Sequence, residues 1–233
     1  MMELKDATVF ITGANGGLGT QLVEAALTRG AQRVYAGARS PKPWGDGRVV
    51  PVKVDLADAA SIDEAVQQTG DTTVLVNNAA IFPRSDLLTG SFTELESVVQ
   101  TNLLGPIHLT RSLAPSLVAA KGALININSV LSWFAVGKAH SVSKAGLWMA
   151  TNAFRLELAP QGVHVLGVYP GPMDTPMQSG EDRTGMTDPA DIAGAVYDAL
   201  GAGEYELLTD ETAGKVHGAL AAPVTALYPS LAK

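Results

Sequence analysis

Short apolar runs alternate along the chain with stretches in which apolar residues recur every three or four positions. Most runs are continuous rather than strictly alternating, which is typical of strands buried on both faces of a parallel sheet. The runs predict seven strands, at residues 7–11, 32–38, 49–54, 73–76, 123–128, 163–169 and 205–208. The periodic stretches predict helices at residues 20–30, 61–68, 92–120 (apart from Gly105-Pro106), 139–159 and 188–200.

Strands that alternate with helices predict an α/β fold with a seven-stranded, mainly parallel sheet and helices on both faces. Right-handed crossovers make such a sheet doubly wound, or Rossmann-like. We see no internal repeat or linker, so residues 1–233 are expected to form a single domain. Ser61 and Glu64 form a capping box that predicts a helix start at Ser61. The tail from Thr212 has no clear period.

Composition narrows the class of protein. The chain is 46% hydrophobic and 17% charged, which supports a large core and excludes a disordered chain. The apolar runs are too short to span a membrane, and the start of the chain lacks the features of a secretory signal. We therefore expect a cytoplasmic enzyme. A net charge of -7 without any basic run argues against nucleic acid as a partner.

Metal and disulfide chemistry find no support in the sequence. There is no cysteine, which excludes disulfides and thiolate metal sites. The four histidines are scattered without a ligand spacing, so no metal site is predicted: His108, His140, His164 and His217.

A glycine-rich turn follows the first predicted strand and opens the first predicted helix. Gly13, Gly17 and Gly19 would let the backbone turn tightly and approach a pyrophosphate, which the free N–H groups of the helix would bind. Their spacing differs from the usual dinucleotide fingerprint. A ligand-free turn is the alternative.

The end of the second predicted strand indicates which dinucleotide would bind. Enzymes that use NAD carry an acidic residue there, which binds the ribose 2′-hydroxyl group. This chain has Arg39, whose guanidinium suits a 2′-phosphate. The sequence therefore favours NADP(H) over NAD(H), unless Arg39 is only a solvated loop residue.

Candidate reactive groups follow the fifth predicted strand. Ser129 ends that strand, and His140 and Lys144 lie four residues apart, on one face of the next predicted helix. The three side chains can converge if that helix begins near Ala139.

Together these motifs resemble the short-chain dehydrogenase/reductase family from Thr12 to about Leu208. Asn77-Asn78-Ala79-Ala80 resembles the family's N-N-A-G motif with the last glycine replaced, and the segment 170–175 resembles its P-G segment. The resemblance implies catalytic roles for Ser129, Lys144 and Asn102. It also implies that the cofactor is bound by Gly13, Asn15, Gly17, Leu18, Gly19, Arg39, Asp55, Leu56, Asn78, Ala79, Lys144, Pro170, Gly171, Met173 and Thr175.

One position departs from the family pattern Y-x-x-x-K, because His140 stands where the family has its catalytic tyrosine. Imidazole suits acid–base chemistry near neutral pH, but Lys144 would depress its pKa and leave a weak acid. Three interpretations stay open. The chain is an active reductase with altered pH dependence, a crippled reductase of natural or mutational origin, or a fold recruited to non-redox chemistry or cofactor-linked binding.

The resemblance also indicates a substrate class. It places the substrate pocket beside Phe82, Trp133 and Met177, so a hydrophobic ketone or aldehyde, or the matching alcohol, is expected. The polar, glycine-containing segment at residues 177–187 has the character of a mobile lid. The resemblance further implies a homodimer or homotetramer assembled through the helices predicted at 92–120 and 139–159.

Overall fold

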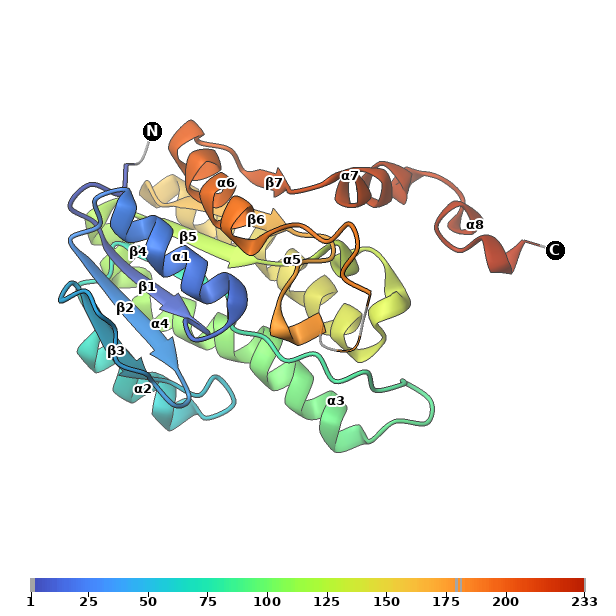
Figure 1. The fold of residues 1–233 in the computed structure, drawn as a ribbon, viewed down its shortest axis with the longest axis horizontal. Coiled ribbons are helices and arrows are strands. Elements are labelled where there is room, and N and C mark those ends of the chain that lie inside the picture. The colour runs from blue at the N-terminus through green and yellow to red at the C-terminus, as the bar shows by residue number, and fades with distance from the viewer. Residues whose placement is uncertain (1–2, 179, 181, 233) are drawn as a thin grey trace.

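The structure, a computed structural model, describes residues 3–178, 180 and 182–232. Seven parallel strands form one sheet in the order β3-β2-β1-β4-β5-β6-β7 (Figure 1). The strands are β1 (Thr8–Thr12), β2 (Arg33–Ala38), β3 (Val49–Lys53), β4 (Val74–Asn77), β5 (Ala123–Ile127), β6 (His164–Tyr169) and β7 (Glu206–Leu208). The predicted fold class is confirmed, and each strand lies within two residues of its predicted bounds. That the chain is a single domain stays a prediction.

Helices cover both faces of the sheet. Figure 1 shows α1 (Gly17–Thr28) and α6 (Pro189–Ala202) together on one face, where they pack on each other and bury Val9 and Ile11 of β1. Helices α2 (Ala59–Gln68) and α4 (Gly105–Ala120) bury Phe10 on the opposite face, which α5 (Ala139–Leu158) also covers. Alternate residues of β1 thus belong to two cores, which explains why its three middle residues are all apolar. Among the described residues, no helix has the length and apolar character needed to span a membrane.

The predicted start of α2 was wrong. The helix begins at Ala59, and its N-cap is Asp58, whose carboxylate accepts a hydrogen bond of 3.0 Å from the Ala60 N–H. Aspartate is a strong N-cap residue, and it precedes the serine along the chain. The Ser61 hydroxyl accepts a 3.0 Å hydrogen bond from the Asp55 N–H instead.

The helix predicted at residues 92–120 continues through Gly105-Pro106, but its geometry changes just before them. Helix α3 (Phe92–Val99) leads into a π-helical turn (Gln100–Leu104), which leads directly into α4. Pro106 cannot donate a hydrogen bond to the Asn102 carbonyl four residues earlier, and its ring would crowd that carbonyl. The wider π turn accommodates both constraints. A Cβ on Gly105 would lie 2.3 Å from the Leu56 carbonyl oxygen, so the chain must pass close there.

The tail contains two helices that the sequence did not predict, α7 (Glu211–Gly218) and α8 (Val224–Leu227), and Figure 1 shows it running beyond the end of the sheet. Asp210 caps α7 by accepting a 2.9 Å hydrogen bond from the Ala213 N–H. An acidic first turn and a basic last turn accompany this cap, and together they were a usable sequence signal.

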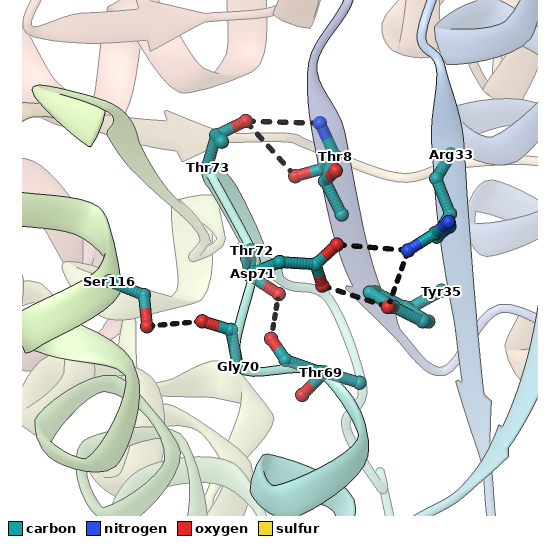
Figure 2. Close-up of polar contacts among 9 residues, drawn as sticks. All are labelled: Thr8, Arg33, Tyr35, Thr69, Gly70, Asp71, Thr72, Thr73 and Ser116. Atoms are coloured by element: carbon teal, nitrogen blue, oxygen red, sulfur yellow. Dashed lines mark hydrogen bonds and ion pairs between the residues drawn. The ribbon is translucent and has the colours of Figure 1, made fainter. Parts of the chain in front are cut away.

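The amino ends of the strands are joined by polar contacts (Figure 2). Asp71, just before β4, accepts hydrogen bonds from Arg33 at 2.9 Å and from the Tyr35 hydroxyl at 2.8 Å, both on β2. On the other side of the same loop, the Ser116 hydroxyl of α4 donates to the Gly70 carbonyl at 2.6 Å. These contacts fix the loop that leads into β4.

Candidate active site

A cavity of about 630 Å³ opens at the carboxyl ends of the central strands, where the strand order changes direction between β1 and β4. Doubly wound sheets bind their ligands at this position. Every residue expected to contact the cofactor lines this cavity, and so do Ser129, His140, Phe82 and Met177. Their roles stay predictions, but the sequence motifs meet at one place.

The glycine turn fits closely against its surroundings. Gly13 has φ +67°, and a Cβ there would lie 2.8 Å from Ala79 Cα. A Cβ on Gly19 would lie 2.1 Å from the Gly13 carbonyl oxygen. Gly16 is the N-cap of α1 without a side-chain hydrogen bond, and the first turn of the helix carries no acidic residue. This helix end therefore suits the pyrophosphate of a dinucleotide.

Two loops at the edge of the cavity are tied together. The Asn15 side chain donates a 2.8 Å hydrogen bond to the Ser40 carbonyl, which links the glycine turn to the segment after β2. Arg39 lies on that segment, lines the cavity and is exposed to solvent. Asp55 and Leu56, after β3, lie on the cavity wall too, so the adenosine end of a dinucleotide would lie here.

Thr12 connects the ends of β1 and β4. Its hydroxyl accepts hydrogen bonds from the backbone N–H groups of Asn78 at 3.0 Å and Ala79 at 3.1 Å. The Asn78 side chain donates in return to the Thr12 carbonyl at 2.8 Å. The positioning role of this threonine was not predicted. A polar residue at the end of an otherwise apolar strand was the signal available for it.

Asn102 lies behind the cavity wall and is fully buried. Its side-chain oxygen accepts from the Ile81 N–H at 2.8 Å, and its amide nitrogen donates to the Ile81 carbonyl at 2.9 Å. The His140 Nδ1 lies 3.0 Å from the same carbonyl. Asn102 and His140 are therefore joined through the backbone of Ile81, which no sequence motif identified.

His140 is almost completely buried at the start of α5, with the Phe82 ring against it at a centroid distance of 4.4 Å. Burial, and secondarily the charge of Lys144, lower the pKa of His140 to about 4, against a smaller opposing effect of the Ile81 carbonyl. The imidazole is therefore neutral at physiological pH.

Lys144 follows one helical turn later and is also buried. Its ammonium donates a 2.6 Å hydrogen bond to the Ile127 carbonyl at the end of β5. Burial lowers the pKa of Lys144 to about 8. Among the described residues, no carboxylate pairs with the ammonium to oppose this effect. The Ser129 hydroxyl accepts from the Leu131 N–H at 3.1 Å and donates weakly to the Pro170 carbonyl at 3.4 Å.

Trp133 is not brought to the cavity with the other predicted substrate residues. Its ring stacks on Tyr169 at 4.4 Å and contacts His217 of α7 at 4.6 Å, and only 7% of the residue is exposed. The physical reason is that Tyr169 of β6, Trp148 of α5 and His217 of the unpredicted helix α7 surround the indole ring. The lid predicted at 177–187 lies partly outside the described residues, and its mobility stays a prediction.

Comparisons with known proteins identify the family of this chain. Residues 7–185 match the model of the short chain dehydrogenase family, so the chain belongs to that family and is an oxidoreductase. An uncharacterised oxidoreductase of Staphylococcus saprophyticus is 30% identical over 219 residues, which are 86% of this chain and 93% of that protein.

Two further relatives carry cofactor information in their names. An NADPH-dependent 1-acyldihydroxyacetone phosphate reductase of Schizosaccharomyces pombe is 31% identical over 200 residues, 81% of this chain and 67% of that protein. A short chain dehydrogenase from Burkholderia cenocepacia, crystallised in complex with NADP, is 34% identical with a TM-score of 0.90, and all of both chains is covered.

Proposed function

We propose that this chain is an NADP(H)-dependent oxidoreductase that interconverts a hydrophobic ketone or aldehyde and its alcohol by hydride transfer. The observation that carries the proposal is that one cavity is lined at one end by Arg39 and the open end of α1, and at the other by Ser129, His140 and Lys144. This arrangement suits a dinucleotide whose nicotinamide lies beside the reactive side chains.

The preference for NADP(H) rests on Arg39. The hydrogen bond between Asn15 and Ser40 fixes the loop on which Arg39 lies, and the guanidinium has the geometry to bind a 2′-phosphate. The names of the Schizosaccharomyces reductase and of the Burkholderia complex support the same cofactor. When bound, the cofactor supplies or accepts the hydride.

The side chains at the inner end of the cavity take the remaining tasks. The Ser129 hydroxyl donates to the carbonyl oxygen of the substrate, and the Lys144 ammonium contacts the nicotinamide ribose. His140 stands where the family has its tyrosine and exchanges the proton with the substrate oxygen. Asn102 acts as a positioning residue, because it holds Ile81, which holds His140.

The wall of the cavity supports a hydrophobic substrate. Ile81, Phe82, Leu131, Met173 and Met177 line it near the reactive groups. Family membership also supports assembly into a homodimer or homotetramer through α4 and α5. The exposed apolar side chains Val142, Met149 and Leu156 of α5 fit such an interface.

A second candidate is a protein that binds NADP(H) without efficient turnover. One observation favours it: at neutral pH the buried His140 is uncharged and is therefore a weak proton donor. This candidate predicts tight NADPH binding with no NADPH oxidation in the presence of any carbonyl substrate.

The decisive experiment measures NADPH oxidation with a panel of aryl ketones and aldehydes, for the wild-type chain and for His140→Tyr. We expect wild-type turnover that is slow at neutral pH, and faster ketone reduction by His140→Tyr. NADPH binding without turnover in either protein would reject the oxidoreductase proposal for these substrates. Equal rates would remove the proposed role of residue 140 in proton transfer.

A further inference from the structure

Hydrogen bonds among Asn102, Ile81 and Ser143 determine which nitrogen of the His140 ring carries a proton. The Asn102 oxygen accepts from the Ile81 N–H, which fixes the orientation of the amide group. One hydrogen of its Nδ2 goes to the Ile81 carbonyl, and the other goes to the Ser143 hydroxyl at 3.1 Å. That hydroxyl donates its own hydrogen to the His140 carbonyl at 2.7 Å. Asn102 therefore has no hydrogen left for the His140 Nδ1, although the two atoms are 3.3 Å apart.

The Ile81 carbonyl decides the tautomer. A carbonyl oxygen only accepts, so the 3.0 Å contact with the His140 Nδ1 requires that Nδ1 carry the proton. In a neutral imidazole the other nitrogen, Nε2, is then an acceptor. No described residue hydrogen-bonds Nε2, and His140 lines the cavity.

The groups around the ring keep it neutral. Lys144 of α5 contributes a like charge, and Phe82 covers one side of the ring. The guanidinium of Arg84 lies 5.5 Å from the centre of that phenyl ring, so it adds positive rather than negative charge to this side. The contacts from the π-helical turn and from Ser143 are uncharged.

We infer that His140 presents an unprotonated Nε2 to the cavity, so that the ligand it accepts directly is a hydroxyl donor, namely the alcohol form of the substrate. This inference rests on the proposed function and assigns a direction to its proton transfer. In alcohol oxidation the O–H bond breaks and its proton moves to Nε2. A bound oxidised nicotinamide cofactor would accept the hydride that leaves the carbinol carbon with its electron pair, and the C=O double bond forms.

The retained Nδ1–H bond to the Ile81 carbonyl stabilises the imidazolium that this step creates. Ketone reduction runs the same step backwards and needs Nε2 protonated before hydride arrives. Because the pKa of His140 is about 4, that form becomes roughly tenfold rarer with each pH unit above it. The two directions should therefore differ in their pH dependence.

The kinetic test measures kcat/KM between about pH 5 and pH 7, below the pKa of Lys144 of about 8. Oxidation of a secondary aryl alcohol with NADP+ should be constant over this range. Reduction of the matching ketone with NADPH should fall roughly 100-fold from the lower to the higher pH. An oxidation rate that rises roughly tenfold per unit would overturn the inference, because it would require an acid that keeps its proton up to neutral pH.

A second measurement needs no turnover. Long-range 1H–15N NMR correlations of the 15N-labelled chain at pH 7 should show His140 with a protonated Nδ1 and an unprotonated Nε2. His140→Gln assigns the signals by removing them, and His108→Gln, on the surface beside Asp63, should leave them in place. A proton on Nε2 would overturn the inference even if the enzyme is active. A protein without turnover but with the proton on Nδ1 would reject the proposed function and leave the protonation state of His140 confirmed.

Discussion

Ionisable side chains at the two ends of the parallel sheet have different hydrogen-bond partners and opposite pKa shifts. At the amino end, Arg33 has the partners Asp71 and Tyr35, and the hydrogen bond and charge interactions with Tyr35, followed by those with Asp71, raise the pKa of Arg33 (Figure 2). At the carboxyl end, the side chains of His140 and Lys144 donate hydrogen bonds to the backbone carbonyls of Ile81 and Ile127, and the pKa values of both side chains are lowered.

We therefore expect the amino end of the sheet to contribute to stability and the carboxyl end to contribute to activity. Charges that are paired within the protein fix the chain and need no ligand. Buried groups with lowered pKa values beside a cavity are available for substrate and cofactor. Variants at the carboxyl end should therefore change activity far more than stability, and variants at the amino end should do the opposite.

The largest effect is expected for Ser129→Ala. Removal of the hydroxyl proposed to polarise the substrate carbonyl should lower kcat/KM by about 10²- to 10³-fold, with the Kd for NADPH unchanged. Steady-state kinetics and fluorescence titration measure the two quantities. The control is Ser132→Ala, which removes another buried hydroxyl from the same loop and should leave kcat/KM nearly unchanged. Similar losses in both variants would contradict the role of Ser129.

Arg39→Ala should produce the next largest effect. Loss of charge-assisted hydrogen bonds to a 2′-phosphate costs about 1.5–3 kcal/mol, so the Kd for NADPH should rise roughly 10- to 100-fold while the Kd for NADH stays constant. Lys42→Ala is the matched control, since Lys42 lies on the same loop but packs over Trp44 at 4.6 Å. Equal weakening of both cofactors by Arg39→Ala would remove the basis for preferring NADP(H).

A substitution at the amino end of the sheet should lower stability and leave activity unchanged. Asp71→Asn weakens the contacts with Arg33 and Tyr35, which are partly exposed. The Tm should fall by no more than about 4 °C, with kcat/KM unchanged. Thermal denaturation and steady-state kinetics test both statements. If Asp71→Asn is fully folded and still loses activity, the amino end does not act on stability alone.

A smaller effect is expected where α5 begins. Lys138 has φ +54° and ψ -121°, a conformation that favours glycine, and it directly precedes the helix that carries His140. Lys138→Gly should raise the unfolding free energy by about 1 kcal/mol, measured by urea denaturation. Lys121→Gly, in the milder left-handed conformation at φ +48° and ψ +44°, should change it less. A larger gain at Lys121 would show that residue 138 is not strained.

The sequence predicted the central strands β1, β4 and β5 well, because they are largely apolar and are buried throughout. The glycine turn was equally readable, since strand, turn and helix follow one another directly. By contrast, the contact between Asn102 and His140 depends on the backbone of Ile81, and no residue type encodes a carbonyl position. The position of the Trp133 ring depends on contacts with Tyr169 and His217, which lie far from it in the sequence. The start of α2 was missed through local competition between two capping residues, Asp58 and Ser61.

The π-helical turn at Gln100–Leu104 makes the number of residues in this helix as important as their identity. Each residue of a helix advances its direction by roughly 100°. Asn102 must face Ile81, while Thr110 must accept the 2.9 Å hydrogen bond from Asn77 on the sheet. An insertion or deletion between these two positions would rotate one contact away whenever the other is kept. Functional relatives should therefore vary in sequence along this stretch more readily than in length.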